Sequence, residues 1–458
     1  MLRVVKCEGF QIMGSEMRNA ALKVVQTLQD RGFQAVFAGG CVRDERLGLS
    51  PKDYDVATNA VPAEVLAAYP NAMTVGAHFG VVLVKVGGHA IEIATFRTDG
   101  SYADGRKPDS VTFATIEEDA SRRDFTVNGI FYDPLSETLL DFVHGQDDID
   151  AGILRCIGDP LERFAEDHLR LLRAIRFATR FGFEIAPETW DALKTCAPSI
   201  TRISPERIRD ELDRIWVHPN RVLGFDLLVD SGLMPAILPE ILDLQGCEQP
   251  PQWHPEGDVF VHTRMMLDIL PDEASLPLVL SVLFHDIAKP ATYTYDEADQ
   301  RIRFNGHDKL GAEMTEVILR RLKYSNEIIE ATVIAVANHM AFAHVQKMRV
   351  AKLKRFMARP TFADELELHR VDCSSSHGKL NNHTFLNAKA EEFANEPLIP
   401  SPLVNGHELM ALGHEADPHL GRILHAIQTH QLEGTLRTKE EALAWLKAEG
   451  EAAWEGEG

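Results

Sequence analysis

The feature of this sequence that most constrains its fold is a pair of aspartates that follows closely after two glycines. An apolar segment, residues 33–38, ends at Gly39 and Gly40, and a short polar helix is expected to follow it. A second strand is expected to begin with Asp53 and Asp55. Side chains two positions apart in a strand point to the same face, so the two carboxylates are expected to project together from one sheet.

This arrangement favours a site for a metal ion and a nucleotide. Two neighbouring carboxylates repel each other unless a cation lies between them, and Mg²⁺ prefers oxygen ligands together with waters and phosphates. The paired glycines let backbone N–H groups approach an anion closely, and Arg43 can reach the same phosphates with a fork of donors. The alternatives are a simple tight turn and solvated carboxylates, but the order and closeness of these residues favour the metal–nucleotide site.

The charge of the chain limits which partners it can hold. With 458 residues, 45% of them hydrophobic and 25% charged, the chain is expected to form three or four soluble globular domains. Its formal net charge of −22 repels a polyanion, so an RNA partner requires a local basic surface and no DNA partner is expected.

The cysteines and the apolar segments indicate a cytoplasmic protein. The six cysteines are scattered without a Cys-x-x-Cys pair, which is typical of reduced thiols in a cytosol. No cleavable apolar segment is expected at the N-terminus, and no apolar run is expected to be long enough to cross a bilayer, so no membrane partner is predicted.

A hairpin is predicted to place a third carboxylate near the aspartate pair. Residues 81–86 and 90–96 alternate as two strands joined at a Gly-Gly turn. Glu92 lies on the polar side of the second strand, either as a solvated residue or as a third carboxylate of the metal site. The glycine-rich segment 97–108 is predicted to be a mobile loop.

Four motifs in this order resemble one enzyme family. They are Gly-Gly-x-Val-Arg-Asp at 39–44, Asp-x-Asp-x-x-Thr at 53–58, Glu-x-Ala-Thr-Phe-Arg at 92–97 and Arg-Arg-Asp-Phe-Thr-x-Asn at 122–128. Together they are similar to the class II tRNA nucleotidyltransferases and related bacterial poly(A) polymerases, of the polymerase-β-like superfamily. The resemblance implies an α+β fold, with a small mixed sheet in the nucleotidyltransferase head and then an all-helical neck, an HD-type body and a tail. Gly129 departs from the family pattern, which commonly has alanine there.

A helix predicted over residues 166–176 carries a candidate base-reading pair. Asp167 and Arg170 are three positions apart and are therefore expected to be neighbours on its surface, where the simple alternative is an ordinary intrahelical ion pair. Cytosine and adenine both present an amino donor beside an unprotonated ring nitrogen, which an acceptor beside a donor can match. Uracil and guanine present the reverse pattern and would be rejected. The resemblance implies this role, and it implies that Arg173 and Arg176 contact the nucleotide as well.

A second constellation of histidines and aspartates follows after residue 260. Its members are His262, His285, Asp286, His307, His339 and Asp372. This series resembles an HD-type metal phosphohydrolase domain, in which imidazoles and carboxylates hold a divalent metal that activates water against a phosphate ester. Manganese, nickel or cobalt is the second metal expected there. The alternative of a degenerate domain that serves only as a structural part stays open.

The expected domains are a catalytic head at 1–155, a neck with the nucleotide-reading motif and RNA contacts at 156–245, an HD-type domain at 246–385 and a helical tail at 386–458. The basic run at 347–359 is a candidate phosphate-binding patch, although a solvated helix face is its default interpretation. The last residues, 450–458, are predicted to be disordered.

The resemblance implies template-independent addition of C and A to the 3′ end of tRNA from CTP and ATP, with release of pyrophosphate. The expected catalytic residues are Asp53, Asp55 and Glu92, with Mg²⁺ held by Asp53 and Asp55. The residues expected to bind the nucleotide are Gly39, Gly40, Arg43, Arg123, Asp124, Asn128, Asp167, Arg170, Arg173 and Arg176. The alternatives are an enzyme that adds only A, a poly(A) polymerase and, from another class, an HD phosphohydrolase acting on nucleotide or 2′,3′-cyclic phosphate ends.

Overall fold

The structure is a computed structural model that describes residues 3–6, 15–74, 80–100 and 110–449. The predicted disorder at 450–458 and most of the predicted loop at 97–108 lie outside these residues. The chain forms two compact units, Met1–Leu242 with Arg321–Lys323, and Asp243–Arg320 with Tyr324–Gly458. The division into four domains stays a prediction.

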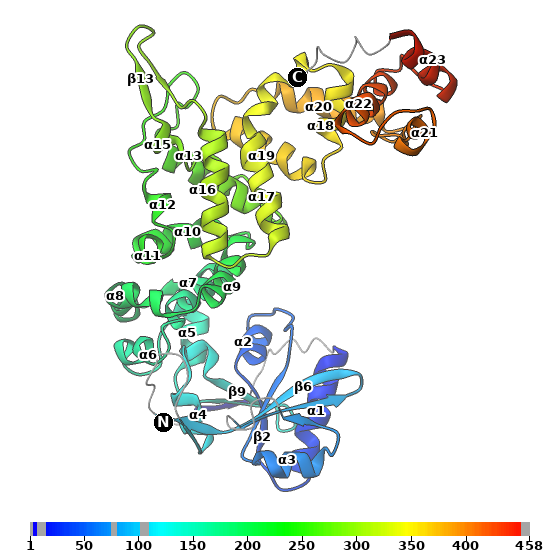
Figure 1. The fold of residues 1–458 in the computed structure, drawn as a ribbon. Coiled ribbons are helices and arrows are strands. Elements are labelled where there is room, and N and C mark those ends of the chain that lie inside the picture. The colour runs from blue at the N-terminus through cyan, green and yellow to red at the C-terminus, as the bar shows by residue number, and fades with distance from the viewer. Residues whose placement is uncertain (1–2, 7–14, 75–79, 101–109, 450–458) are drawn as a thin grey trace. The chain divides into compact units, whose positions relative to one another are not determined.

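The head of the first unit is built on an eight-stranded mixed sheet (Figure 1). In order across the sheet, the strands are β1 (Arg3–Lys6), β10 (Thr138–Asp141), β9 (Ile130–Asp133), β2 (Ala35–Ala38), β3 (Asp55–Thr58), β6 (His89–Thr95), β5 (Val81–Val86) and β4 (Met73–Thr74). Only β3 and β6 pair in parallel; the other neighbours are antiparallel. The small mixed sheet predicted for the head is confirmed.

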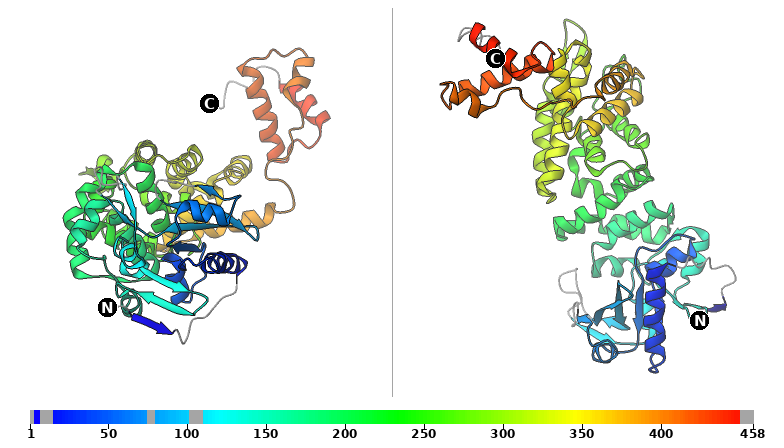
Figure 2. Two further views of the ribbon diagram at one scale, coloured as in Figure 1. Left: turned by 90° about the horizontal axis from the view of Figure 1, so that it is seen from below. Right: turned by 90° about the vertical axis from the view of Figure 1, so that its right-hand side faces the viewer.

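One helix covers the strands that carry the predicted carboxylates. Helix α1 (Glu16–Gln29) packs on β2, β3, β5 and β6 through Ala20, Ala21, Val24, Val25 and Leu28, which are buried, and it lies along the sheet in Figure 2. These residues recur at helical spacing, so they form one apolar face of the helix, and this is the face that is buried. The other head elements are α2 (Gly40–Arg46), α3 (Pro62–Ala68), β7 (Arg97–Asp99), β8 (Val111–Phe113), α4 (Ile116–Ser121), η2 (Thr126–Asn128) and α5 (Gly145–Ala151).

The rest of the first unit is helical, as predicted, apart from one short strand pair. Its elements are β11 (Ile153–Leu154), α6 (Pro160–Glu166), α7 (Arg170–Phe181), β12 (Glu184–Ile185), α8 (Pro187–Cys196), η3 (Ala197–Arg202), α9 (Pro205–Trp216), α10 (Arg221–Asp230), α11 (Leu233–Ile237) and α12 (Pro239–Leu242). Strands β11 and β12 pair in parallel. Helix α7 packs against α9 and α10, which holds its arginine-rich side beside the head.

The second unit is helical around one apolar helix. It contains α13 (Val259–Asp268), α14 (Leu276–Phe284), α15 (Lys289–Thr292), β13 (Thr294–Asp296), β14 (Arg301–Arg303), α16 (His307–Arg321), α17 (Asn326–Asn338), η4 (His339–Lys347), α18 (Val350–Met357), α19 (Phe362–Ser375), α20 (Asn381–Phe393), α21 (Gly406–Ala411), α22 (Pro418–Leu432) and α23 (Lys439–Glu449). Helix α14 is apolar on all sides because it packs against α13, α17 and α19 at once. The hairpin of β13 and β14 is the exception to the helical prediction.

The prediction that no apolar run could cross a bilayer was too strong. The helical stretch Asn326–Lys347 is long and apolar enough to do so by length and composition. This stretch comprises α17 and η4, and its apolar side packs against α14 and α19 in the helical core. Among the described cysteines, Cys41, Cys156, Cys196, Cys247 and Cys373 are free thiols.

The basic run at 347–359 is divided between packing and solvent. Arg355 donates to the Thr429 hydroxyl on α22 at 2.9 Å, and Arg359 pairs with buried Glu365. The Lys354 ammonium lies 5.1 Å from the centre of the Phe393 ring. Lys347, Arg349 and Lys352 are exposed. Both interpretations of the run, a solvated helix face and a phosphate-binding patch, stay predictions.

Candidate functional site

The first unit contains a cavity of about 830 Å³ between the head and the helices that follow it. It collects twelve of the predicted residues: Gly39, Gly40, Arg43, Asp53, Asp55, Arg123, Asp124, Asn128, Asp167, Arg170, Arg173 and Arg176. Glu92 does not line the cavity, but it is the direct partner of Asp55 in the parallel pairing of β6 with β3. Residues predicted from separate motifs are thereby brought to one place.

The three carboxylates form an acidic cluster at the start of β3. Asp53 lies just before the strand and Asp55 is its first residue, while Tyr54 between them is buried. The pKa of Asp55 is raised to about 6, because the site desolvates the carboxyl and because Asp53 and Glu92 add negative charge. A divalent cation would relieve this repulsion, and an all-oxygen donor set of this kind fits Mg²⁺.

The glycine turn stands between β2 and α2, where a turn was predicted. Gly39 precedes α2 with a φ of +67°, which favours glycine. A Cβ atom at this position would lie 2.7 Å from Nη1 of Arg123. Arg123 in turn donates to the backbone oxygen of Asn128 at 3.2 Å. The backbone conformation therefore favours glycine at this position, and a larger residue would also have to displace the Arg123 guanidinium.

Arg43 and Asn128 belong to one network of polar side chains on the cavity wall. Arg43 donates to the side-chain oxygen of Asn128 and, at 2.9 Å, to Asp44. Its guanidinium also lies 4.7 Å from the centre of the Phe181 ring. Burial lowers the pKa of Arg43. These contacts hold a buried cation in a fixed orientation toward the cavity.

Asp124 links the head to α7. Its carboxylate accepts from Arg173 Nε at 2.9 Å, from Asn128 Nδ2 at 3.0 Å and from the Phe125 backbone N–H at 2.8 Å. Although burial alone would raise the pKa of Asp124, Arg173 and these hydrogen bonds hold it well below the usual range. Asp124 is therefore a structural anion that positions Arg173 and Asn128 on two walls of the cavity.

The predicted base-reading helix differs from the observed one. The chain is not helical throughout residues 166–176, because α6 ends at Glu166 and α7 begins at Arg170. Asp167 lies in the break, where its carboxylate accepts from the Leu169 backbone N–H at 3.1 Å and from Arg207 at 3.3 Å. Arg170 donates to Glu166 at 2.5 Å. The simple prediction of two helical residues three apart was wrong, but both side chains do line the cavity.

The cavity also contains cations that the motifs did not predict. These are Lys52, Arg180, Arg207 and Arg214, whereas Arg122, which also lines the cavity, is the first residue of the fourth motif. Arg180 continues the spacing of the arginines on α7, which could have indicated it, and it pairs with Asp44 at 2.7 Å. Arg207 and Arg214 come from α9 and carry no local signal, because only the packing of α9 against α7 brings them to the site.

The balance of charge in the cavity is opposite to that of the whole chain. Nine arginines and Lys52 line it, against five aspartates. The desolvated guanidinium of Arg176 has its pKa lowered to about 10, so it still carries its charge at neutral pH. This is the local basic surface that an acidic chain needs in order to hold a polyphosphate or a strand of RNA.

A second cavity, of about 480 Å³, lies in the second unit beside the predicted HD residues. Asp286, His307, His339 and Asp372 line it, and His262 and His285 lie within ligand distance of Asp286. The six residues come from α13, from the end of α14, from the start of α16, from the end of α17 and from α19. All six predicted residues are therefore brought together.

The hydrogen bonds around this cluster orient the histidines toward Asp286. Nδ1 of His285, His307 and His339 lies 2.9, 2.7 and 2.6 Å from a backbone carbonyl oxygen. A carbonyl can only accept, so each Nδ1 carries a hydrogen, and in the neutral form of the ring Nε2 then presents a lone pair. Second-shell bonds of this kind fix the tautomer of metal-binding histidines.

The lone pairs converge as they would around a cation. Nε2 of His307 and Nε2 of His339 are 3.1 Å apart, and they lie 3.4 and 3.8 Å from an oxygen of Asp286. Burial and the neighbouring His285 lower the pKa of His339 to about 4, which keeps this imidazole neutral. Two groups of possible ligands share Asp286, namely His262 with His285 and His307 with His339. These residues fit one or two divalent metal ions.

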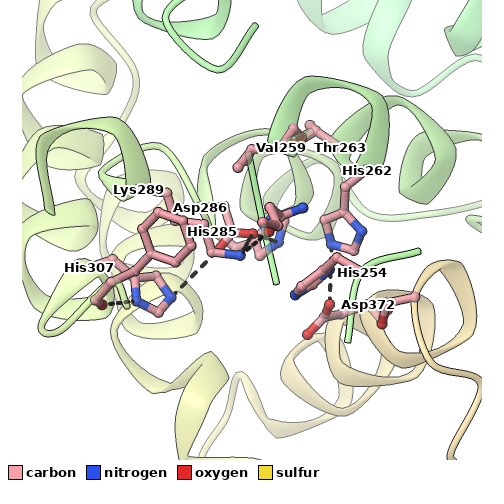
Figure 3. Close-up of polar contacts among 12 residues, drawn as sticks. His254, Val259, His262, Thr263, His285, Asp286, Lys289, His307 and Asp372 are labelled. Carbon is pink, nitrogen blue, oxygen red and sulfur yellow. Dashed lines mark hydrogen bonds and ion pairs between the residues drawn. The ribbon is translucent and has the colours of Figure 1, made fainter. Parts of the chain in front are cut away.

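The structure adds three residues to this cluster. Glu256 accepts from Nδ1 of His262 at 2.7 Å and contacts Nδ1 of His254 at 2.9 Å, while Nε2 of His262 lies 3.2 Å from Asp372 (Figure 3). Lys289 pairs with Asp286 at 2.6 Å. Lys289 could have been predicted from the sequence, because it lies three residues after Asp286. No comparable spacing in the sequence indicates His254 or Glu256.

Three family models match separate parts of the chain. Residues 35–155 match the poly A polymerase head domain, residues 182–244 match the probable RNA and SrmB-binding site of polymerase A, and residues 258–369 match the HD domain. The resemblance inferred from the motifs is thereby confirmed. The chain combines a poly A polymerase head domain with an HD domain.

Known proteins are similar to this chain in sequence and in fold. A CCA-adding enzyme of Geobacillus stearothermophilus is 42% identical over 214 residues, which are 46% of this chain and 53% of that enzyme. One from Lactiplantibacillus plantarum is 38% identical over 239 residues, which are 51% of this chain and 58% of that enzyme. The chain thus spans about half the length of the curated relatives it matches.

The fold agrees over nearly the whole chain with a solved structure. The crystal structure of the Bacillus stearothermophilus CCA-adding enzyme in complex with CTP has a TM-score of 0.75 and 25% sequence identity. The likeness covers 96% of this chain and 99% of that one. The predicted α+β class, with a mixed sheet followed by helices, is confirmed.

The raised pKa of Asp55 predicts how its removal changes stability. A carboxyl whose pKa rises from 3.8 to about 6 on folding disfavours the folded state once pH passes through that range. Asp55→Asn should therefore stabilise the metal-free protein at pH 8, by about 1 kcal/mol or less because the side chain is exposed and screened. The gain should vanish near pH 4. The free energy of unfolding is measured with urea, in the presence of EDTA, at both pH values. Asp191→Asn, which changes an exposed carboxylate, is the control. An equal gain in stability at both pH values would contradict the raised pKa of Asp55.

Proposed function

We propose that this chain, which combines a poly A polymerase head domain with an HD domain, adds CCA to the 3′ end of tRNA without a nucleic-acid template, using CTP and ATP. The observation that carries the proposal is the cavity in which the acidic cluster of Asp53, Asp55 and Glu92 stands beside a wall of arginines. The name shared by the relatives, CCA-adding enzyme, supports it. The proposed partners are the tRNA 3′ end, CTP and ATP, and the proposed place of action is the cytoplasm.

In the proposed reaction, the 3′-hydroxyl of the RNA attacks the α-phosphate of the nucleotide and pyrophosphate leaves. Asp53 and Asp55 hold the divalent cation, proposed to be Mg²⁺, with Glu92 behind them. When bound, such an ion lowers the pKa of the hydroxyl and neutralises charge on the phosphates. The N–H groups at Gly39 and Gly40 and the guanidiniums of the wall bind the triphosphate and keep it in line.

The nucleotide base is proposed to meet Asp167 beside Arg170. Asp167 already has one backbone N–H and one guanidinium as partners, so its direction is set before the nucleotide arrives. Its remaining lone pairs can accept from the amino group that cytosine and adenine share. Preorganised polar groups of this kind discriminate because a mismatched base leaves them without partners.

A second activity is proposed for the HD domain, because its histidine lone pairs converge on Asp286. The domain would hydrolyse phosphomonoesters or 2′,3′-cyclic phosphates, with water adding to phosphorus and an alcohol leaving. His262, His285, Asp286, His307, His339 and Asp372 would hold manganese, nickel or cobalt, and such an ion supplies an activated water. Lys289 holds the Asp286 carboxylate in place.

One experiment separates CCA addition from its alternatives. Purified protein is incubated with tRNA that ends before CCA, before CA and before A, each with labelled CTP or ATP. Full CCA addition requires C on the first two substrates and A on the third. Incorporation on the third tRNA alone would indicate an A-adding enzyme, and long A tails on unrelated RNA would indicate a poly(A) polymerase.

Asp53→Ala and Asp55→Ala should each lower incorporation of both nucleotides by more than about a hundredfold, as when one preorganised charge-stabilising group is removed from an active site. The reason is that either change leaves the acidic cluster with too few ligands. Incorporation of labelled CTP and ATP measures the loss. Glu117→Ala removes an exposed carboxylate of the same head and should retain activity. Near-normal turnover of either site variant would refute the metal site.

Asp167→Ala should relax the choice of nucleotide more than it slows metal-dependent turnover, because the change removes a base acceptor and leaves the phosphate contacts. A good hydrogen-bonding match is worth about 1–3 kcal/mol of discrimination, or about 5- to 150-fold. The ratio of kcat/KM for CTP to that for UTP measures this effect. Exposed Glu162→Ala on the neighbouring helix α6 is the control. An unchanged ratio in Asp167→Ala would count against base reading by this residue.

Asp286→Ala should abolish phosphate hydrolysis and spare nucleotide addition, because Asp286 is common to both groups of possible metal ligands. A loss of at least about a hundredfold is expected, since removal of an outer-shell partner alone costs 10–100-fold. Metal content per chain should fall in parallel. Asp268→Ala removes an exposed carboxylate on α13 and serves as the control. If the wild type shows no hydrolysis with Mg²⁺, Mn²⁺, Ni²⁺ or Co²⁺, the domain is a structural part.

A further inference from the structure

One wall of the HD cavity is aromatic, and the proposed hydrolysis makes no use of it. Trp253 lines the cavity together with His377, on the same cavity as the metal-type residues Asp286 and Asp372. The side chain of Trp253 is 40% exposed. A large aromatic side chain that stays partly exposed on the wall of a cavity is typical of a binding surface.

Trp253 is held in place by its neighbours. Its ring centre lies 5.7 Å from that of His377 in an edge-to-face arrangement. The Lys379 ammonium lies 5.2 Å from the Trp253 ring centre, and the Lys379 backbone N–H donates to Nδ1 of His377 at 3.0 Å. The Trp253 backbone N–H donates to the Pro250 carbonyl at 3.0 Å. The ring is thus preorganised by contacts from two segments far apart in the sequence.

The charges around this ring suit a nucleotide. Lys379 stands over the Trp253 ring, and Arg301 on β14 lines the same cavity. Aromatic rings beside cations are what proteins use to bind single-stranded nucleic acid ends, since the base stacks and the phosphates pair with the charges. A cavity of about 480 Å³ is also within the size range of small-ligand sites.

We propose that Trp253 is a stacking platform for a nucleobase, so that the HD cavity selects phosphates attached to a nucleoside over base-free phosphomonoesters. The proposal rests on the hydrolytic function proposed above for the same cavity. His377 and Lys379 act as positioning residues for the ring. The phosphate of the bound nucleotide then lies on the side of Asp286, and its base lies on the side of Trp253.

The test compares a substrate that has a base with one that has none. Hydrolysis of adenosine 3′-phosphate and of glycerol 2-phosphate is followed by release of inorganic phosphate, for the wild type, Trp253→Ala and Trp253→Phe. Stacking energies measured by alanine substitution correspond to roughly 5- to 150-fold. Trp253→Ala should lose that factor in kcat/KM on adenosine 3′-phosphate and less than twofold on glycerol 2-phosphate. Trp253→Phe should retain most of the preference.

A matched control and a binding measurement make the result decisive. Trp190 on α8 also has a lysine over its ring, with Lys194 Nζ at 5.3 Å, but it lines neither cavity, so Trp190→Ala should change neither rate. Calorimetric binding of adenosine 3′-phosphate, with EDTA present so that no metal-dependent hydrolysis occurs, is the second measurement. It should weaken by the same factor in Trp253→Ala.

The outcomes separate this proposal from the hydrolytic function. Equal losses on both substrates, or equal binding by the wild type and Trp253→Ala, would overturn the stacking role. If the wild type hydrolyses neither substrate but binds adenosine 3′-phosphate in a manner that depends on Trp253, the hydrolytic function fails and the nucleotide site stands.

Discussion

The head cavity depends on one ion pair, between Asp124 of the head and Arg173 of α7. Asp124 is buried and accepts from Arg173, Asn128 and a backbone N–H, so nearly all its hydrogen-bonding capacity is used inside the protein. Removing Arg173 would leave the buried Asp124 carboxylate without its charged partner, which destabilises the folded state. The pair therefore holds the glycine turn and the arginine-rich side of α7 at a fixed spacing. This contact therefore sets the distance between the two walls of the cavity.

Both candidate sites bring several possible metal ligands close together, but they do so with different side chains. In the head, the carboxylates of Asp53, Asp55 and Glu92 crowd together, and the pKa of Asp55 rises to about 6 because the site desolvates this carboxyl and because the other two add negative charge. In the HD domain, Nδ1 of His285, His307 and His339 each lies against a backbone carbonyl oxygen, which turns Nε2 of each buried ring toward Asp286. Oxygen ligands suit a hard ion that shares phosphate oxygens with a nucleotide, whereas imidazoles suit a transition metal. The two arrangements fit the two different metal-dependent reactions proposed above.

Predictions from the sequence were most accurate where local periodicity and residue chemistry agree. The hairpin of β5 and β6 and the glycine turn were predicted because each depends on neighbouring residues. Reasoning from spacing failed at residues 166–176, where a helix was assumed to be continuous. The chain leaves the helical conformation there, because Asp167 follows the end of α6 in an extended conformation and its carboxylate accepts from the Leu169 N–H. In the basic run at 347–359, spacing could not show that Lys354, Arg355 and Arg359 have partners on other helices.

The sequence by itself determined the chemical identity of both sites, because the motifs carry the carboxylates, glycines, arginines and histidines that the chemistry needs. It also determined the class of fold. Only the tertiary structure decided which other residues join those sites. Glu92 stands beside Asp55 because β3 and β6 pair in register, Arg207 reaches Asp167 because α9 packs on α7, and Trp253 meets His377 across more than a hundred residues. Such contacts depend on packing between distant segments, which no local pattern of residues encodes.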